Sequence, residues 1–289
     1  MSITGVDTVR AGARYHGDAA AAPGLLDFAV NVRRARPPGW LTRRLAFRLA
    51  DLGNYPSAAD TEAAVDAVAA RHGRSADEVL PLTGAAEAFA LLPALSPRCA
   101  ALIAPSFTEP EALLAAAGVP IEHVVLDPPF GLAGARVPEQ ADLVVVGNPT
   151  NPTGVTHTRA DILALRRPGR LLVVDEAFAD AIPGEPQSLA GQRLDPADGD
   201  VLVLRSLTKT WGLAGLRVGY ALGDPALLTR LAARRQHWPV NTLALEAIAA
   251  CCAPEAVAQA AAEAADLAEL RTQMAAGLTG IGVDVVPGQ

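Results

Sequence analysis

The amino-acid sequence predicts an α/β fold in which helices cover a mixed, mostly parallel β-sheet. Beyond residue 78, short runs of Val, Ile and Leu alternate with longer Ala- and Leu-rich stretches, as in chains built from repeated strand–helix units. Residues 143–146, 171–174 and 201–204 are apolar throughout. Such runs are typical of central strands that are buried on both faces.

The other expected elements follow from the same patterns. Helices are expected over 61–72, 85–95 and 110–117, and strands over 100–104, 123–126 and 283–286. Residues 242–278 are Ala-rich and predict a helix with a break near Pro254, because proline lacks the N–H donor that a helix interior needs.

Composition limits the possible functions. The chain has 289 residues, enough for one large domain and a smaller one, and its net charge of −7 does not favour a nucleic-acid partner. No leader-like N-terminal segment and no apolar run of membrane-spanning length occur, so a cytoplasmic protein without a membrane partner is expected. The three cysteines, Cys99, Cys251 and Cys252, have neither disulfide nor zinc spacing, and no metal site is expected.

The basic residues are unusual, because 23 of the 24 are arginines and only Lys209 is a lysine. An arginine can supply positive charge for solubility, but it cannot lose a proton and act as an amine nucleophile. Lys209 is therefore either a residue kept for chemistry or a surface lysine that escaped a compositional bias. The count alone leaves both interpretations open.

The segments that follow the three buried strands distinguish these interpretations. Asn151 follows the strand 143–146, Asp175 follows 171–174, and Lys209 follows 201–204. The carboxyl ends of parallel strands meet at one edge of a sheet, where functional groups of α/β proteins gather. We therefore expect an amide, an acid and the single lysine to lie together.

Such a set fits a pyridoxal 5′-phosphate (PLP) site. Lys209 would hold the cofactor as a Schiff base, Asp175 would keep the pyridine nitrogen protonated, and Asn151 would donate to the phenolic oxygen. Burial would raise the pKa of Asp175, and a pyridinium partner would keep it ionised. Taken singly, Asp175 also suits a helix N-cap and Asn151 a plain turn residue.

The remaining requirement of such a site is a phosphate cradle. Gly84, with the backbone amides of Ala85 and Ala86 at a helix start, is one candidate anion site, although Gly84 alone also fits an ordinary turn. Phe107 could stack on the pyridine ring or simply be a core residue. The other candidate phosphate ligands lie around the lysine: Ser206, Thr208 and Arg217.

In combination these motifs resemble fold-type I PLP enzymes, and more narrowly the class I/II aminotransferases of the histidinol-phosphate aminotransferase group. The resemblance rests on Asn-Pro-Thr-Gly at 151–154, Asp-Glu-Ala-Phe at 175–178, Ser-Leu-Thr-Lys at 206–209 and Gly-Leu-Arg-Val-Gly at 215–219. It implies the roles given above for Lys209, Asp175, Asn151, Ser206, Thr208, Arg217 and Phe107. It also implies that Tyr55 reaches the phosphate in the neighbouring subunit of a homodimer.

The resemblance further implies a division into domains. Residues 1–45 would form the N-terminal segment of a small domain, 46–240 the large PLP-binding domain, and 241–289 the start of the C-terminal small domain. Members of the family continue beyond this point with an arginine that binds the substrate carboxylate. We therefore expect the C-terminal part of the small domain to be incomplete here.

Within the group, the sequence most resembles the L-threonine-O-3-phosphate decarboxylases of cobalamin biosynthesis. The shared segments are Tyr15-His16-Gly17, Leu26 to Asn31, 205–209 and 238–241. The resemblance implies that Tyr15, His16 and Asn31 bind the substrate. Phe178 agrees with it, because aminotransferases usually have a tyrosine at this position.

The sequence therefore favours a decarboxylase that acts on a phosphorylated amino acid. An aminotransferase acting on histidinol phosphate or an aromatic amino acid is the alternative. A protein that binds PLP but is catalytically impaired, because the C-terminal element is missing, is the second alternative.

Overall fold

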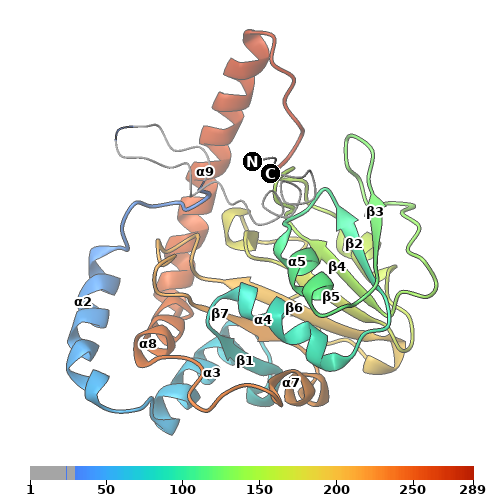
Figure 1. Cartoon of the computed structure of the whole chain (residues 1–289). Helices are drawn as coiled ribbons and strands as arrows, with labels where there is room; N and C mark the ends of the chain where they lie inside the picture. The colour runs from blue at the N-terminus through green and yellow to red at the C-terminus, as the bar shows by residue number, and fades with distance from the viewer. Residues whose placement is uncertain (1–23, 25–29) are drawn as a thin grey trace, which may run out of the picture.

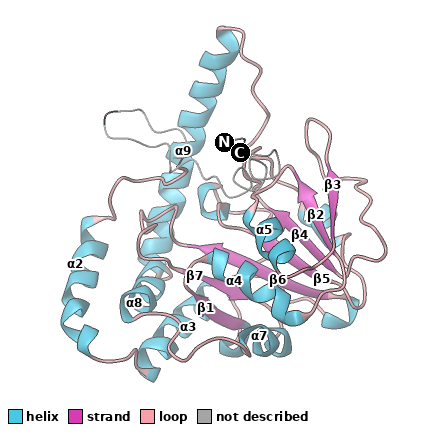
Figure 2. Ribbon diagram, viewed as in Figure 1, coloured by secondary structure: helices cyan, strands magenta, loops and turns pink. Residues whose placement is uncertain are grey.

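The computed structural model describes Gly24 and residues 30–289. Seven strands form one sheet in the order β1-β7-β6-β5-β4-β2-β3. The strands are β1 (Val79–Leu82), β2 (Ala100–Ala104), β3 (Ile121–Val125), β4 (Leu143–Gly147), β5 (Leu171–Asp175), β6 (Asp200–Ser206) and β7 (Gly219–Leu222). Only β7 runs antiparallel to its neighbours β1 and β6. The mixed, mostly parallel α/β sheet is therefore confirmed (Figure 2).

Helices lie on both faces of this sheet (Figure 1). The α-helices are α2 (Gly39–Phe47), α3 (Ala58–His72), α4 (Ala85–Leu91), α5 (Glu109–Ala116), α6 (Arg159–Leu163), α7 (Pro225–Ala232), α8 (Thr242–Cys251) and α9 (Pro254–Gly280). Short 3₁₀ helices span Arg48–Gly53, Ala76–Glu78, Leu92–Leu95, Ala179–Ala181 and Pro196–Asp198.

Alternation along the buried strands creates two cores. In β4, Val144 and Val146 face one core, which α3, α6 and α8 complete, whereas Leu143 and Val145 face a second core with α4, α5 and α7. Successive side chains of a strand point to opposite faces, so a strand covered on both sides has to be apolar throughout. This is the physical reason that the three apolar runs became central strands.

The C-terminal region differs from the expectation at one point. Val283, Val285 and Val286 form no strand and are 44%, 40% and 43% exposed, so the predicted strand over 283–286 is wrong. A strand needs a partner for its backbone hydrogen bonds, and no described strand lies beside this segment.

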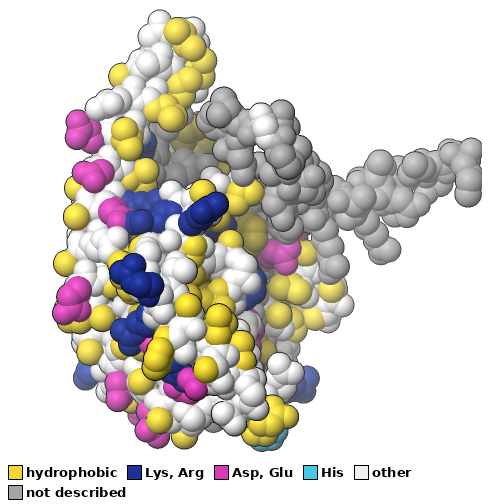
Figure 3. Space-filling view, turned by 90° about the vertical axis from the view of Figure 1, so that its left-hand side faces the viewer, with side chains coloured by type: hydrophobic (Ala, Val, Ile, Leu, Met, Phe, Trp, Pro, Cys, Tyr) yellow, Lys and Arg dark blue, Asp and Glu magenta, His cyan; other side chains and the backbone are white. Residues whose placement is uncertain are grey.

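Helix α9 extends beyond the sheet (Figure 1). Its first half packs on the protein through Ala256, Ala260 and Ala264, whereas Leu270 and Met274 in its second half are 59% and 62% exposed. Figure 3 shows hydrophobic side chains along this projecting end. The helix therefore has a packed half and an uncovered half.

No single helix in the described ranges is long and apolar enough to cross a membrane. The bent pair of α8 and α9 meets the length and composition criteria only when the two helices are taken together, across a bend of 70°.

Candidate active site

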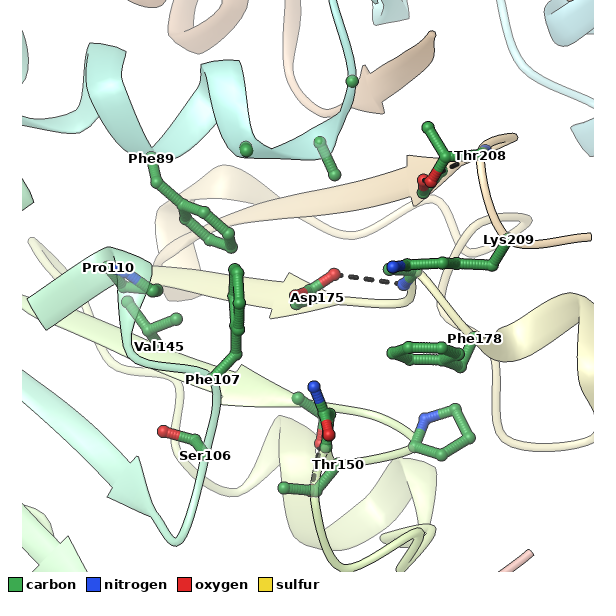
Figure 4. Close-up of a pocket in the computed structure, with 18 of the residues that line it drawn as sticks. Phe89, Ser106, Phe107, Pro110, Val145, Thr150, Asp175, Phe178, Thr208 and Lys209 are labelled. Atoms are coloured by element: carbon green, nitrogen blue, oxygen red, sulfur yellow. Dashed lines mark hydrogen bonds between the residues drawn. The ribbon is translucent and has the colours of Figure 1, made fainter. Parts of the chain in front are cut away.

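The three expected functional residues converge at the carboxyl ends of the central strands. Strands β4, β5 and β6 are parallel neighbours, and their register places Gly147 beside Asp175 and Asp175 beside Leu204. Asn151 lies four residues past the end of β4, and Lys209 lies three past the end of β6. Figure 4 shows Lys209 extending toward Asp175 across the cavity between them.

A cavity of about 160 Å³ brings ten of the predicted residues together. Its lining includes Gly84, Ala85, Ala86, Phe107, Asn151, Asp175, Ser206, Thr208, Lys209 and Arg217. These residues lie at or after the ends of β2, β4, β5 and β6, just before β7, and at the start of α4. The fold, and not local sequence, therefore assembles the cavity.

Asp175 is partly buried and lines this cavity. Burial raises the pKa of its carboxyl group to about 6, and the nearby Lys209 charge lowers the pKa only in part. The Ala177 backbone N–H donates to Asp175 Oδ1 at 3.0 Å, which fixes the orientation of the carboxylate. A buried carboxylate of this kind gains most from a cationic partner that enters the cavity.

The phosphate candidates form a cradle at one end of the cavity. Gly84 adopts a φ of +86°, and a Cβ at this position would lie 3.1 Å from Arg217 Nη2. Only glycine therefore allows the guanidinium to approach the start of α4, where the first N–H groups have no helical acceptor. On the other side, Ser206 Oγ and Thr208 Oγ1 share a hydrogen bond of 2.6 Å.

Two phenylalanines flank the space between lysine and acid. Phe107 and Phe178 both point into the cavity in Figure 4. The Lys209 Nζ atom lies 5.9 Å from the centroid of the Phe178 ring. Sequence reasoning did not assign Phe89, Ser106 or Thr150 to the cavity, although all three line it. The sequence around Phe89 does not predict a role in the cavity, because Phe89 looks like any apolar residue of a helix.

A second cavity of about 500 Å³ continues past Lys209. It shares Asn151, Phe178 and Lys209 with the first cavity, and Asn31 lines it as well. Arg33 also lines this second cavity, and sequence reasoning missed it because it is one arginine among 23.

One predicted residue lies away from both cavities, and two are not among the described residues. Tyr55 lines neither cavity of this chain; it is 73% exposed and stacks on Trp238 at a ring separation of 4.0 Å. Tyr15 and His16 lie outside the described residues.

A buried ion-pair network lies next to the site. Arg205, directly before Ser206, is 1% exposed and donates to Glu176 and Asp180. Arg71 of α3 also donates to Asp180, at 2.9 Å. The network therefore ties the segment that carries Phe178 to both β6 and α3.

The lining fits PLP as a resident cofactor. It offers one primary amine, one buried carboxylate at the opposite side, one amide, and a cradle of hydroxyl, backbone and guanidinium donors. A Cβ at Gly84 would crowd the Arg217 guanidinium, which is one of the cradle's donors. In the part of the chain that the structure describes, no group of three His, Cys, Asp or Glu side chains could hold a metal ion.

Comparison with known proteins supports the same conclusion. Residues 45–289 match the family described as aminotransferase class I and II. The chain belongs to this family. It is therefore a PLP-dependent enzyme with the fold of that family, as its motifs predicted.

Individual relatives within the family differ in how similar they are to this chain. A histidinol-phosphate aminotransferase of Mycobacterium tuberculosis is 65% identical over 96% of this chain and 75% of its own length. A threonine-phosphate decarboxylase of a Sinorhizobium species is 35% identical over 72% of this chain and 60% of its own. The crystal structure of a histidinol-phosphate aminotransferase from Sinorhizobium meliloti, in complex with PLP, aligns with a TM-score of 0.73 at 20% identity over 88% of this chain and 70% of its own.

These identities correct the expected function. The sequence favoured a decarboxylase of cobalamin biosynthesis, but the aminotransferase relative is far more similar over much more of the chain. The prediction was wrong because the segments behind it include 205–209, which lines the candidate cofactor cavity. A cofactor site is common to both reactions and does not decide which bond of the substrate breaks.

Proposed function

We propose that this chain is an aminotransferase that acts on histidinol phosphate or a closely related phosphorylated amine. The observation that carries the proposal is the 65% identity to histidinol-phosphate aminotransferases over nearly the whole chain. The convergence of Lys209, Asp175 and Asn151 on one cavity supports it, because amino transfer needs all three functions.

The cofactor-binding residues act as follows. Lys209 Nζ would hold the cofactor aldehyde, Asp175 would face the pyridine nitrogen, and the Asn151 amide would donate to the phenolic oxygen. Phe107 would cover one face of the ring. The cradle that would hold the phosphate consists of Gly84, Ala85, Ala86, Ser206, Thr208 and Arg217.

When bound, PLP supplies the electron sink that makes the substrate Cα–H acidic. The Lys209 amine would move the proton at the substrate Cα. The Phe178 ring lies beside Lys209 Nζ, at 5.9 Å from its centroid. The Asp175 carboxylate would attract a protonated pyridine nitrogen most strongly in a site with little water.

The test is amino transfer from histidinol phosphate to 2-oxoglutarate by the full chain loaded with PLP. Glutamate should form with the wild-type protein and with Arg193→Ala, which removes an exposed cation that lines neither cavity. Lys209→Ala should form none and should lack the visible absorbance of lysine-bound cofactor. A wild-type protein that shows this absorbance but transfers no amino group from histidinol phosphate would contradict the proposal.

We also propose a homodimer in which Tyr55 reaches the cofactor phosphate of the partner subunit. Tyr55 and Trp238 stack on one another and are both exposed, at 73% and 53%. Phe47, Leu49 and Leu52, in the neighbouring part of the sequence, are exposed as well. Exposed aromatic and aliphatic side chains within one short segment are typical of a protein interface.

For the domains, we keep residues 46–240 as the large domain and assign 1–45 and 241–289 to a small domain. The uncovered half of α9 supports this division, because its apolar side chains lack a described layer over them (Figure 3).

A further inference from the structure

The loop between β4 and α6 carries Asn151 into the cavity, and a buried histidine lies behind this loop. The loop folds back on itself at Thr150, whose backbone N–H donates to the Val155 carbonyl oxygen at 2.9 Å. The Thr150 carbonyl oxygen accepts from the Gly154 N–H at 2.7 Å. Thr150 lines both cavities and directly precedes Asn151. The position of Thr150 therefore sets where the Asn151 backbone enters the site.

His157 holds this loop at two points. It is 4% exposed, and its Nε2 atom lies 3.2 Å from Thr150 Oγ1. Its backbone N–H donates to Asn148 Oδ1 at 2.8 Å. The Asn148 backbone N–H in turn donates to the Asp175 carbonyl oxygen at 2.8 Å. One histidine is thus bonded to the residues on both sides of Pro149.

The hydrogen bonds assign the hydrogen on the His157 ring. Thr150 Oγ1 lies 2.7 Å from the Gly147 carbonyl oxygen, which can only accept, so the hydroxyl hydrogen is used there. The Thr150 oxygen is then the acceptor for His157, and Nε2 carries the hydrogen. Burial lowers the pKa of His157, so the ring is uncharged at neutral pH. The ring is therefore a neutral donor to the loop.

The turn that contains Thr150 is tight. A Cβ at Gly147 would lie 3.2 Å from Thr150 Cα and 3.6 Å from the Pro149 carbonyl oxygen. Thr150 is therefore held between the end of β4 and the His157 ring. Closely packed groups transmit a displacement to their neighbours, so a shift of Thr150 moves Asn151, the next residue in the chain.

We propose that His157 is a positioning residue for the Asn151 amide. Its Nε2–H fixes Thr150, and Thr150 fixes the point from which the Asn151 side chain reaches the phenolic oxygen of the cofactor. The inference rests on the role proposed above for Asn151 in cofactor binding, but it does not depend on the identity of the amino substrate. His157 itself lines neither cavity, so it acts through Thr150.

The measurement is the pH at which the visible absorbance of lysine-bound PLP changes, which reports the pKa of the Lys209 nitrogen attached to the cofactor. A donor at the phenolic oxygen stabilises negative charge, and that charge is greatest once the lysine nitrogen has lost its proton. The Asn151 amide therefore lowers this pKa. Asn151→Ala should raise the midpoint by about one unit or more, the loss expected for a hydrogen bond to a charged oxygen.

His157→Leu removes the Nε2–H but keeps the backbone N–H that bonds to Asn148. It should raise the midpoint in the same direction as Asn151→Ala but by less, between about 0.3 and 1 unit. His157→Gln should restore the wild-type midpoint, because glutamine carries an N–H at the same number of bonds from Cβ. Adding His157→Leu to Asn151→Ala should cause no further shift, because no amide is left to position. His123→Leu, the same change at an exposed histidine that lines neither cavity, should leave the midpoint unaltered.

Several results would overturn the inference. A wild-type midpoint in His157→Leu would show that the histidine does not act on the amide, even if the PLP-free variant melts at a lower temperature. Equal shifts in His157→Leu and His157→Gln would show that the N–H is not what matters. A further shift when His157→Leu is added to Asn151→Ala would show that His157 affects the cofactor without Asn151.

A measurement on the PLP-free wild-type protein tests the donor directly and needs no variant to fold. Nuclear magnetic resonance of the His157 ring should show a neutral imidazole with its hydrogen on Nε2. A hydrogen on Nδ1 alone, or a charged ring at neutral pH, would overturn the inference.

Failure of the inference differs from failure of the proposed function. Midpoints that shift as expected, without amino transfer from histidinol phosphate to 2-oxoglutarate, would leave the inference standing and refute the function. Amino transfer by the wild type, with a wild-type midpoint in Asn151→Ala, would leave the function standing and refute both the role of Asn151 and the inference.

Discussion

Replacing Asp175 by asparagine should stabilise the protein when PLP has been removed and destroy its affinity for PLP. Asp175 is partly buried, and this burial raises the pKa of its carboxyl group from 3.8 to about 6. Ionising it in the folded protein therefore carries a penalty of about 3 kcal/mol, since a tenfold change in an equilibrium constant is worth about 1.4 kcal/mol. Asparagine has the same shape, can still accept from the Ala177 N–H, and carries no charge.

The effect should depend on pH in a defined direction. Below pH 3.8 the carboxyl is protonated in both the folded and the unfolded chain, so the wild type and Asp175→Asn differ little. Between pH 3.8 and about 6 the folded wild type binds more protons than the unfolded chain, so its stability falls as the pH rises. Above pH 6 the free energy of unfolding of Asp175→Asn should exceed that of the wild type by up to about 3 kcal/mol. The cost of burying the new NH₂ group reduces this difference.

Urea unfolding of the PLP-free proteins at several pH values between 4 and 8 measures this difference. Asp142→Asn is a control of opposite sign. Burial opposes ionisation there too, but hydrogen bonds from Arg98 and Cys99 lower the pKa of Asp142, so this variant should lose stability at neutral pH. An Asp175→Asn protein less stable than the wild type at pH 8, or a difference independent of pH, would refute the reasoning.

Three further predictions concern the surroundings of the site. Arg205→Met leaves the buried Glu176 without a cation and Asp180 with Arg71 alone, and it should reduce the free energy of unfolding by about 3–5 kcal/mol in urea titrations. Unchanged stability would contradict the role of the network. Tyr55→Ser should shift sedimentation toward the monomer and weaken PLP binding, and a wild-type protein that sediments as a monomer would contradict the interface assigned to Tyr55 and Trp238. Arg217→Met should raise the dissociation constant of PLP by about tenfold or more in an absorbance titration. An unaltered dissociation constant would show that Arg217 does not bind the cofactor phosphate.

Local sequence pointed to functional positions where only one type of residue can perform the required role. A single lysine after a buried strand led to the cofactor site, because no arginine can replace an amine nucleophile. The same holds for Gly84, whose positive φ and close approach to Arg217 exclude a side chain. Both features are visible in the sequence because their chemistry tolerates no substitute.

Local sequence was a poor guide where pairing decides the structure. The apolar segment 283–286 resembles a strand but has no described neighbour to bond with, and it stays irregular. Conversely, β1 contains Pro81 and β7 spans only four residues, and we predicted neither strand. Both form because β7 pairs antiparallel to β1 and to β6. Strand formation depends on hydrogen bonds to another segment, which no local pattern contains.

The sequence by itself therefore determined the fold class, the cofactor and the residues at the ends of the central strands. The tertiary structure decided how these residues meet: the register of β4, β5 and β6 places Asp175 next to both neighbouring strand ends. Only the tertiary structure placed Arg33 beside Lys209, where the Arg33 backbone N–H donates to the Lys209 carbonyl oxygen from a distant part of the chain. Composition records which side chains a chain has, but charge and hydrogen bonding act through distances that folding alone sets.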